Sequence, residues 1–292
     1  MLNLFKKLKA YIELMRVHNV IASLFGVLVG FVSVTRCLDL NVWIPMIPVA
    51  LVSAAGYVIN DYYDYRSDLV NKPWRPIPSG RVTLKEAYVF SIILYVLGVA
   101  SSIYLGLLLV LFTLANALMT YYYSKSIKET GLLGNVVVSL GGANTIIYGG
   151  LAAEYLYGSY GNELNFIIPA LFAFTLLLLR EIVKGIEDYY ADEVRNVRTL
   201  VRVAGYKVAS LASIALTTVL VILTVITILF FNYSWVFLIL AIVTISTSYI
   251  ATTYVYVSRN LDMAVRRAGK SRSLLKVSIF TGLLAFLLNY II

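Results

Sequence analysis

Three aspartates, Asp61, Asp64 and Asp68, follow one another at helical spacing, directly after Asn60. At about 100° per residue, an α-helix would hold the three carboxylates within about 60° of one another. Mg²⁺ prefers oxygen ligands and typically takes one or two carboxylates together with water and substrate phosphates. The spacing therefore predicts a divalent-cation site on one face of a helix.

A second acidic cluster contains Asp188 and Asp192, with Lys184 one helical turn before them. These three residues lie at successive i, i+4 positions and would form one stripe on a helix. Both clusters follow long apolar runs, and ionisable residues near a membrane are costly, face the bundle interior and usually mark function. Solvated helix ends would explain either cluster alone, but explain the two together less well.

Carboxylates gathered in one cavity would repel one another unless cations lay among them. Two clusters therefore suggest more than one Mg²⁺, bridged by a diphosphate. Basic residues lie close by in the sequence: Lys72 and Arg75 follow the first cluster, and a short loop holds Lys125 and Lys128. Lys and Arg are the usual phosphate-binding side chains, although each of these residues, taken alone, is better explained as a determinant of membrane orientation.

The composition predicts an all-α, polytopic membrane protein with a single domain over residues 1–292. Of its 292 residues, 60% are hydrophobic and 13% charged, and the mean hydropathy is +0.84. Soluble domains carry about 25% charged residues, and a spanning helix needs about 20 apolar ones. Nine apolar runs meet this length, at residues 17–35, 42–63, 86–104, 106–123, 132–153, 165–186, 208–231, 234–257 and 274–292. The third and fourth form one uncharged stretch, in which Gly106 is the expected turn.

The basic residues predict the orientation of these spans. If alternate flanking segments share a side, all but Arg36 of the 24 Lys and Arg residues fall on the side of the N-terminus. The positive-inside rule makes this side cytoplasmic. Both acidic clusters then lie on the cytoplasmic face of the cell membrane. The net charge of +9 follows from this asymmetry and does not indicate nucleic acid as a partner.

Other classes of protein fit less well. A divalent-cation transporter would carry acids deep in its spans or on both faces, whereas Asp39, Glu154 and Glu163 are expected in outer loops without recurring spacing. Membrane CDP-alcohol phosphotransferases use clustered aspartates, but their D-G-x-x-A-R element is missing. A nucleophilic Cys-His site is disfavoured, because Cys37 and His18 are the single members of their kinds and lie far apart in the sequence.

The ordered motifs resemble the UbiA superfamily of intramembrane prenyltransferases over essentially the whole chain. The N-D-x-x-D-x-x-x-D motif is matched from Asn60 to Asp68, and the D-x-x-x-D motif at Asp188 and Asp192. A loop motif of the superfamily is matched at Tyr123, Ser124, Ile127 and Lys128. Nine helices is also the family number.

Within the superfamily, the stretches 71–79 and 180–184 are most similar to archaeal geranylgeranylglyceryl phosphate geranylgeranyltransferases. Three positions depart from that pattern: Gly185 where Asp is frequent, and Ala191 and Asn196 where Gly is frequent. The resemblance implies transfer from geranylgeranyl diphosphate to geranylgeranylglyceryl phosphate, which forms the second ether bond of archaeal lipids. An aromatic acceptor such as 4-hydroxybenzoate is the alternative within the family.

The resemblance also implies roles for individual residues. One Mg²⁺ would be held by Asp61, Asp64 and Asp68, and a second by Asp188 and Asp192, so that these aspartates carry the catalysis. Substrate-binding residues would be Asn60, Lys72, Arg75, Tyr123, Lys128 and Lys184. The isoprenoid diphosphate donor and the lipid-like acceptor would enter among membrane lipids, through an apolar groove between helices.

Overall fold

The structure is a computed structural model that describes residues 2–161, 163–231 and 233–292, without side-chain detail for residues 2–4. The described residues contain helices and no strand. The longer helices are α1 (Leu2–Met15), α2 (Val17–Thr35), α3 (Trp43–Tyr63), α5 (Leu84–Ser101), α6 (Gly106–Lys125), α7 (Leu132–Tyr157), α8 (Glu163–Glu187), α10 (Leu200–Phe231), α11 (Trp235–Tyr256) and α12 (Leu261–Ile291). The short ones are η1 (Leu40–Val42), α4 (Tyr65–Asn71), η2 (Ser102–Leu105), η3 (Ile127–Thr130) and α9 (Tyr189–Val194).

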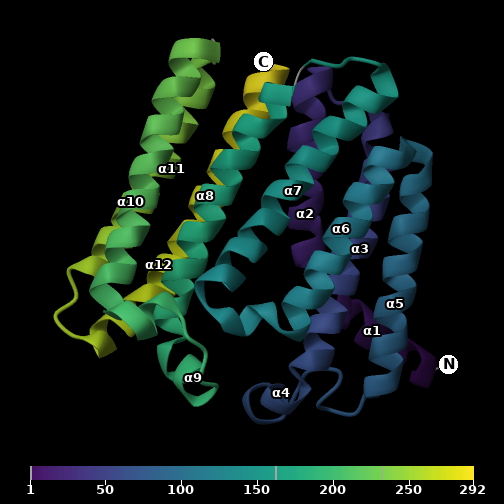
Figure 1. The fold of residues 1–292 in the computed structure, drawn as a ribbon, viewed down its shortest axis with the longest axis vertical. Coiled ribbons are helices and arrows are strands. Elements are labelled where there is room, and N and C mark those ends of the chain that lie inside the picture. Colours follow the sequence, from purple (N-terminus) through teal and green to yellow (C-terminus); the bar gives the residue numbers. More distant parts are fainter. Residues whose placement is uncertain (1, 162, 232) are drawn as a thin grey trace.

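Eight segments of the described chain are long and apolar enough to cross a membrane, and one of them, Leu84–Lys125, contains both α5 and α6. These two helices are separate rods in Figure 1, joined by η2. The chain turns at Gly106, whose φ of 83° is in the region that favours glycine. The expected turn at Gly106 is therefore confirmed, while the count of nine membrane crossings stays a prediction.

Two of the expected spans differ in length from the helices observed. The last one was expected at 274–292, but α12 begins at Leu261 because its charged first half still buries Ala264 and Ala268. Similarly, α10 begins at Leu200 and contains a non-helical residue, Gly205. Both helices therefore continue beyond their apolar parts, into the end of the bundle where the acidic clusters lie.

The helices α3–α4 and α8–α9 have the same construction. Each long helix ends just before an aspartate with φ near −80°, Asp64 in one and Asp188 in the other. A short helix then carries the next aspartate, Asp68 or Asp192, whose amide donates to the carbonyl of the aspartate before it, at 2.8 Å in both. In each segment the helix is thus interrupted at one aspartate, yet the aspartates keep the i, i+4 spacing of a helix. Figure 1 shows α4 and α9 at the same end of the bundle, as expected if alternate flanking segments of the spans share a side.

Close helix contacts depend on small residues where α2 crosses α7. A Cβ atom added at Gly149 would lie 2.1 Å from the carbonyl oxygen of Val27, and one added at Gly30 would lie 1.9 Å from that of Ile146. No side chain can move aside there, because the neighbours are backbone atoms. The adjoining core contains Phe166, which a Cβ on Gly150 would also meet.

We predict that Gly149→Ala destabilises the protein by about 1–3 kcal/mol, because overpacking displaces both helices. Thermal unfolding in detergent, followed by circular dichroism, would show a lower midpoint. The matched control is Gly141→Ala on the same helix, where the nearest atom to an added Cβ is the Met119 methyl carbon at 3.6 Å. Equal midpoints for the two variants would contradict the prediction.

Candidate active site

The first acidic cluster is built around a shared guanidinium. Asp61 and Asp68 are each only 4% exposed. Arg75, in the loop after α4, donates from Nη1 to both carboxylates, at 3.0 Å to Asp61 and 2.6 Å to Asp68. Arg16 forms a second ion pair with Asp61. A single cation therefore reaches both buried carboxylates.

Asp64 lies between these two aspartates at the junction of α3 and α4. Its carboxylate accepts a hydrogen bond from the Asn60 amide at 2.8 Å and pairs with Lys128 of η3 at 2.5 Å. The structure thus brings the predicted residues Asn60, Asp64 and Lys128 together, although 64 positions separate the ion-pair partners in the sequence.

The second acidic cluster has the same pattern. Asp192 is 6% exposed and pairs with Arg195 at 2.5 Å. Burial raises the pKa of the Asp192 carboxyl above its usual range, against the opposing effect of Arg195. Asp188 is half-buried, one turn before it. A cation placed between these two carboxylates would favour their ionised forms.

A further buried carboxylate, Glu181, lies deeper on α8. It is 6% exposed and is held by Arg180 at 2.8 Å and by Lys184 at 3.3 Å. Lys184 also feels the charge of Asp188. The predicted binding residue Lys184 therefore connects Glu181 with the second acidic cluster.

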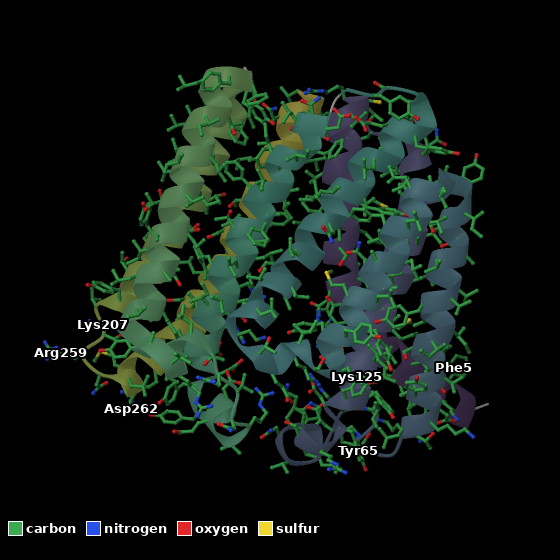
Figure 2. The ribbon with its side chains drawn as sticks, viewed as in Figure 1. Phe5, Tyr65, Lys125, Lys207, Arg259 and Asp262 are labelled. Carbon is green, nitrogen blue, oxygen red and sulfur yellow. The ribbon has the colours of Figure 1, made fainter. Side chains whose placement is uncertain are left out.

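Two tyrosines link the clusters. The charges of Asp64, Glu181 and Lys184 all act on the phenol of Tyr123, at the end of α6. The phenol of Tyr57, on α3, interacts electrostatically with the charges of Arg16, Arg180 and Glu181. The ends of α3, α6 and α8 therefore surround one charged region. Figure 2 shows polar side chains gathered at this end of the bundle.

The sequence predicts Lys72 as a binding residue but does not single out Arg16 or Glu181. Lys72 is exposed, and none of the ion pairs found in the described residues involves it. Arg16 is one of the basic residues that predict the membrane orientation. It lies in a left-handed break between α1 and α2, with φ of 49°, and binds Asp61. Glu181 could have been noticed as an acid inside an apolar run, on the same helix face as Asp188.

The outer acids also need a correction. Glu154 was expected in a loop, but it lies in α7 and is 3% exposed. Glu163 is the first residue of α8, and Asp39 accepts a hydrogen bond from Asn41 at the start of η1. The loop assignment failed because α7 and α8 extend beyond their uncharged segments.

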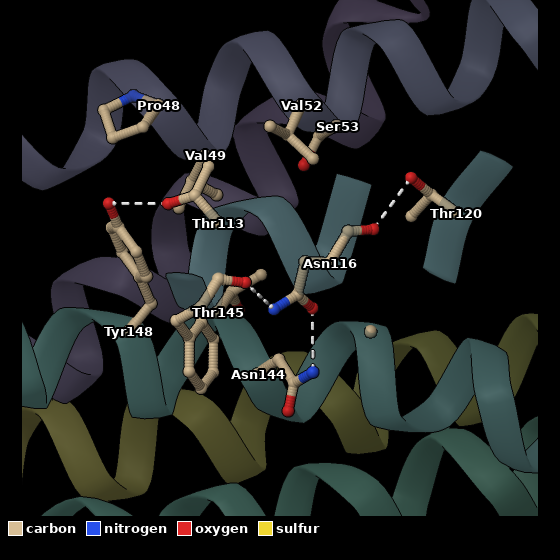
Figure 3. Close-up of a pocket in the computed structure, with 12 residues that line it drawn as sticks. Pro48, Val49, Val52, Ser53, Thr113, Asn116, Thr120, Asn144, Thr145 and Tyr148 are labelled. Carbon is tan, nitrogen blue, oxygen red and sulfur yellow. Dashed lines mark hydrogen bonds between the residues drawn. The ribbon is translucent and has the colours of Figure 1, made fainter. Parts of the chain in front are cut away.

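A cavity of about 60 Å³ lies between α3, α6 and α7, on the membrane side of the first cluster (Figure 3). Its walls are largely apolar, from Pro48, Val49, Val52 and Phe112. Two further lining residues, Asn144 of α7 and Asn116 of α6, are joined by a hydrogen bond of 2.8 Å. Val52 lies nine residues before Asp61, which is about 13.5 Å along a helix.

The fold and the ordered motifs agree with known proteins. Residues 19–280 match the UbiA prenyltransferase family. The chain belongs to this family.

Among curated members, digeranylgeranylglyceryl phosphate synthase of Saccharolobus solfataricus is 40% identical over 285 residues, covering 97% of each chain. The Sulfolobus acidocaldarius protein of the same name is 38% identical, covering 96% of this chain and 98% of that one. A solved structure described as digeranylgeranylglyceryl phosphate synthase in membranes has a TM-score of 0.81 at 31% identity, covering 98% of this chain and 99% of that one. A UbiA homologue from Archaeoglobus fulgidus, solved with GPP and Mg²⁺, shares the fold, with a TM-score of 0.67 at 20% identity, covering 95% of this chain and 99% of that one.

The family assignment confirms the expected all-α, multi-pass membrane prenyltransferase. The donor set suits Mg²⁺, because the residues that converge on Arg75 offer carboxylate oxygens. In the described residues no three acidic side chains converge as a ready-made metal cluster, since the carboxylates of this UbiA chain bind Arg and Lys instead. Arg75 contacts Asp61 and Asp68 with one nitrogen, which shows that one cation can serve both.

We predict that Arg75→Ala lowers the stability of the metal-free protein by about 3–5 kcal/mol, because it leaves two buried carboxylates without their shared cation. Thermal unfolding in EDTA-containing detergent would measure the loss. The control is Lys7→Ala, which removes a solvent-exposed partner of Glu86 and should leave the midpoint unchanged. An Arg75→Ala midpoint equal to that of Lys7→Ala would show that Arg75 is not needed to balance the aspartates.

Proposed function

We propose that this UbiA-family protein transfers a geranylgeranyl group from geranylgeranyl diphosphate to the free hydroxyl of geranylgeranylglyceryl phosphate, in a Mg²⁺-dependent reaction. The observation that carries the proposal is the pair of matching carboxylate clusters at one end of α3–α4 and α8–α9. The acceptor is supported by relatives named digeranylgeranylglyceryl phosphate synthase, which match over nearly their whole length.

In this proposal, Asp61, Asp64 and Asp68 hold one Mg²⁺, and Asp188 and Asp192 a second. Bound Mg²⁺ would neutralise charge that develops on the leaving diphosphate. The solved homologue with GPP and Mg²⁺ supports this type of site. The metal would take up carboxylate oxygens that now bind basic side chains.

The protein's own cations would then contact the diphosphate. Arg75 and Lys128 lie against the first cluster, and Arg195 against the second. Preorganised cations stabilise charge on a leaving group, because they need little rearrangement when that charge appears. Lys72, which is exposed at the end of α4, is the least constrained of the proposed phosphate ligands.

The isoprenoid tails would extend away from the charged end, along the membrane. The cavity between α3, α6 and α7 begins on this side of the first cluster and has apolar walls. Numerous large apolar side chains also face outward along the helices, as expected for a surface in contact with lipid.

We predict that purified protein transfers a labelled geranylgeranyl group to geranylgeranylglyceryl phosphate, and that EDTA stops the transfer. Asp64→Asn and Asp188→Asn should each lower the rate at least about 100-fold. Each change removes a carboxylate that would hold Mg²⁺, and the Mg²⁺ would neutralise the charge on the leaving diphosphate. The matched control is Asp262→Asn, an exposed aspartate at the same end that contacts Tyr190. Transfer to 4-hydroxybenzoate instead of geranylgeranylglyceryl phosphate would keep the proposed chemistry and change the acceptor. Full activity of either aspartate variant would overturn the metal assignment.

We also propose that the carboxylate clusters face the cytoplasm, because basic residues concentrate at their end of the bundle. The single cysteine, exposed Cys37, lies between α2 and α3 at the opposite end. We predict that a membrane-impermeant maleimide labels Cys37 on intact cells. A Cys37→Ser/Glu129→Cys variant, which moves the thiol to η3, should react only after the cells are opened. The reverse pattern would place the site outside.

A further inference from the structure

The proposed reaction produces a proton that some group must accept. When the acceptor hydroxyl attacks C1 of the allylic donor, its oxygen forms a C–O bond and must lose its hydrogen. The aspartates of the two clusters are assigned to the metal ions in the proposed function, on which the present inference rests. A carboxylate outside those clusters, but facing the same space, would meet the need.

Glu181 is such a carboxylate. Residues 181, 184, 188 and 192 lie on one face of the α8–α9 segment, at spacings of three, four and four. Glu181 is seven residues before Asp188, which is about 10.5 Å deeper along the helix. It therefore lies on the membrane side of the second cluster, where the hydroxyl of a lipid-like acceptor is expected.

The similar construction of α3–α4 and α8–α9 defines equivalent positions in the two segments. Asp64 and Asp68 are each 124 residues before their counterparts Asp188 and Asp192, and the same offset places Glu181 opposite Tyr57. The charge of Glu181 acts on the Tyr57 phenol across the site, from α8 to α3. It also acts on the phenol of Tyr123 of α6, on which the charge of Asp64 acts as well. Glu181 thus lies within electrostatic range of tyrosines on α3 and α6, the helices that precede Asp64 and Lys128.

Two basic side chains of the same helix hold the Glu181 carboxylate in place. Arg180 binds one carboxylate oxygen at 2.8 Å and Lys184 the other at 3.3 Å. Each oxygen has a second lone pair that can accept another hydrogen bond. The neighbouring acid Glu187 has different surroundings, because it pairs with Arg272 at 3.1 Å and lies against Gly269 of α12.

We propose that Glu181 takes the proton from the hydroxyl group of the lipid acceptor. The bond between C1 and the diphosphate oxygen breaks, and its electron pair leaves with the diphosphate. An oxygen lone pair of the acceptor forms the new bond to C1, and the hydroxyl proton passes to a Glu181 carboxylate oxygen, from which water removes it. Once its oxygen has begun to bond to C1, the hydroxyl proton is strongly acidic, so that a carboxylate held by two cations is a sufficient base.

The test uses the full-length protein in detergent and a donor that carries oxygen-18 between C1 and phosphorus. Ionisation followed by return moves this label to non-bridging oxygens, whether or not transfer occurs. For Glu181→Gln we expect transfer to fall at least about 100-fold, as for loss of a general base, while the label still scrambles. Glu181→Asp should recover part of the transfer, and Glu187→Gln, the same change on the same helix, should keep it.

Two results would overturn the role of Glu181. Unchanged transfer in Glu181→Gln would show that another group takes the proton. Equal loss of transfer and scrambling would show that Glu181 acts only by placing Arg180 and Lys184 for diphosphate ionisation. A wild-type protein that neither transfers nor scrambles would overturn the proposed function itself, which separates the two failures.

Discussion

The architecture of the charged end depends on one constraint, which is that an ionised carboxylate cannot be buried without a compensating cation. Asp61, Asp68 and Asp192 are buried almost completely, and each binds an arginine. The partners of the first cluster come from separate parts of the chain: the α1–α2 junction, the loop after α4, and η3. These ion pairs therefore fasten three connecting segments to the end of α3. The charges that would bind substrate also order the region that surrounds it.

The two halves of the site share a construction but not a chemistry. At equivalent positions, α3 has Asn60 and Asp61 where α8 has Lys184 and Gly185. An added Cβ at Gly185 would meet nothing closer than Thr199 at 4.0 Å, so that lack of space does not explain the missing aspartate. At these two positions the first half is consequently richer in metal-binding oxygens, and the second carries a lysine. Such asymmetry suits a reaction between two different substrates, one carrying a diphosphate and the other a single phosphate and a hydroxyl.

The sequence predicted much of this arrangement, because apolar length and helical spacing are local properties. The helices, the turn at Gly106 and the common end for both clusters all follow from them. The pairing of Arg16 with Asp61 does not, since it joins residues 45 positions apart through a left-handed break that no local pattern announces. The helical position of Glu154 was missed for a related reason: helix ends are set by packing as well as by hydropathy. Charged residues can be counted from a sequence, but their partners depend on tertiary structure.

The same ion pairs place a basic side chain beside the buried aspartates of the clusters before substrate binds. In the proposed reaction, each paired carboxylate would exchange its arginine or lysine for a metal ion, and each released basic side chain would exchange a carboxylate for a phosphate oxygen. Arg75 is an example of such a basic side chain, because one of its nitrogens contacts both Asp61 and Asp68. In the structure, Asp61, Asp68 and Asp192 each have an arginine partner, which offsets the desolvation cost of their burial. Glu181 differs in that its two cations belong to its own helix, and the exchange need not involve it. It can therefore stay in place beside the clusters while their partners change.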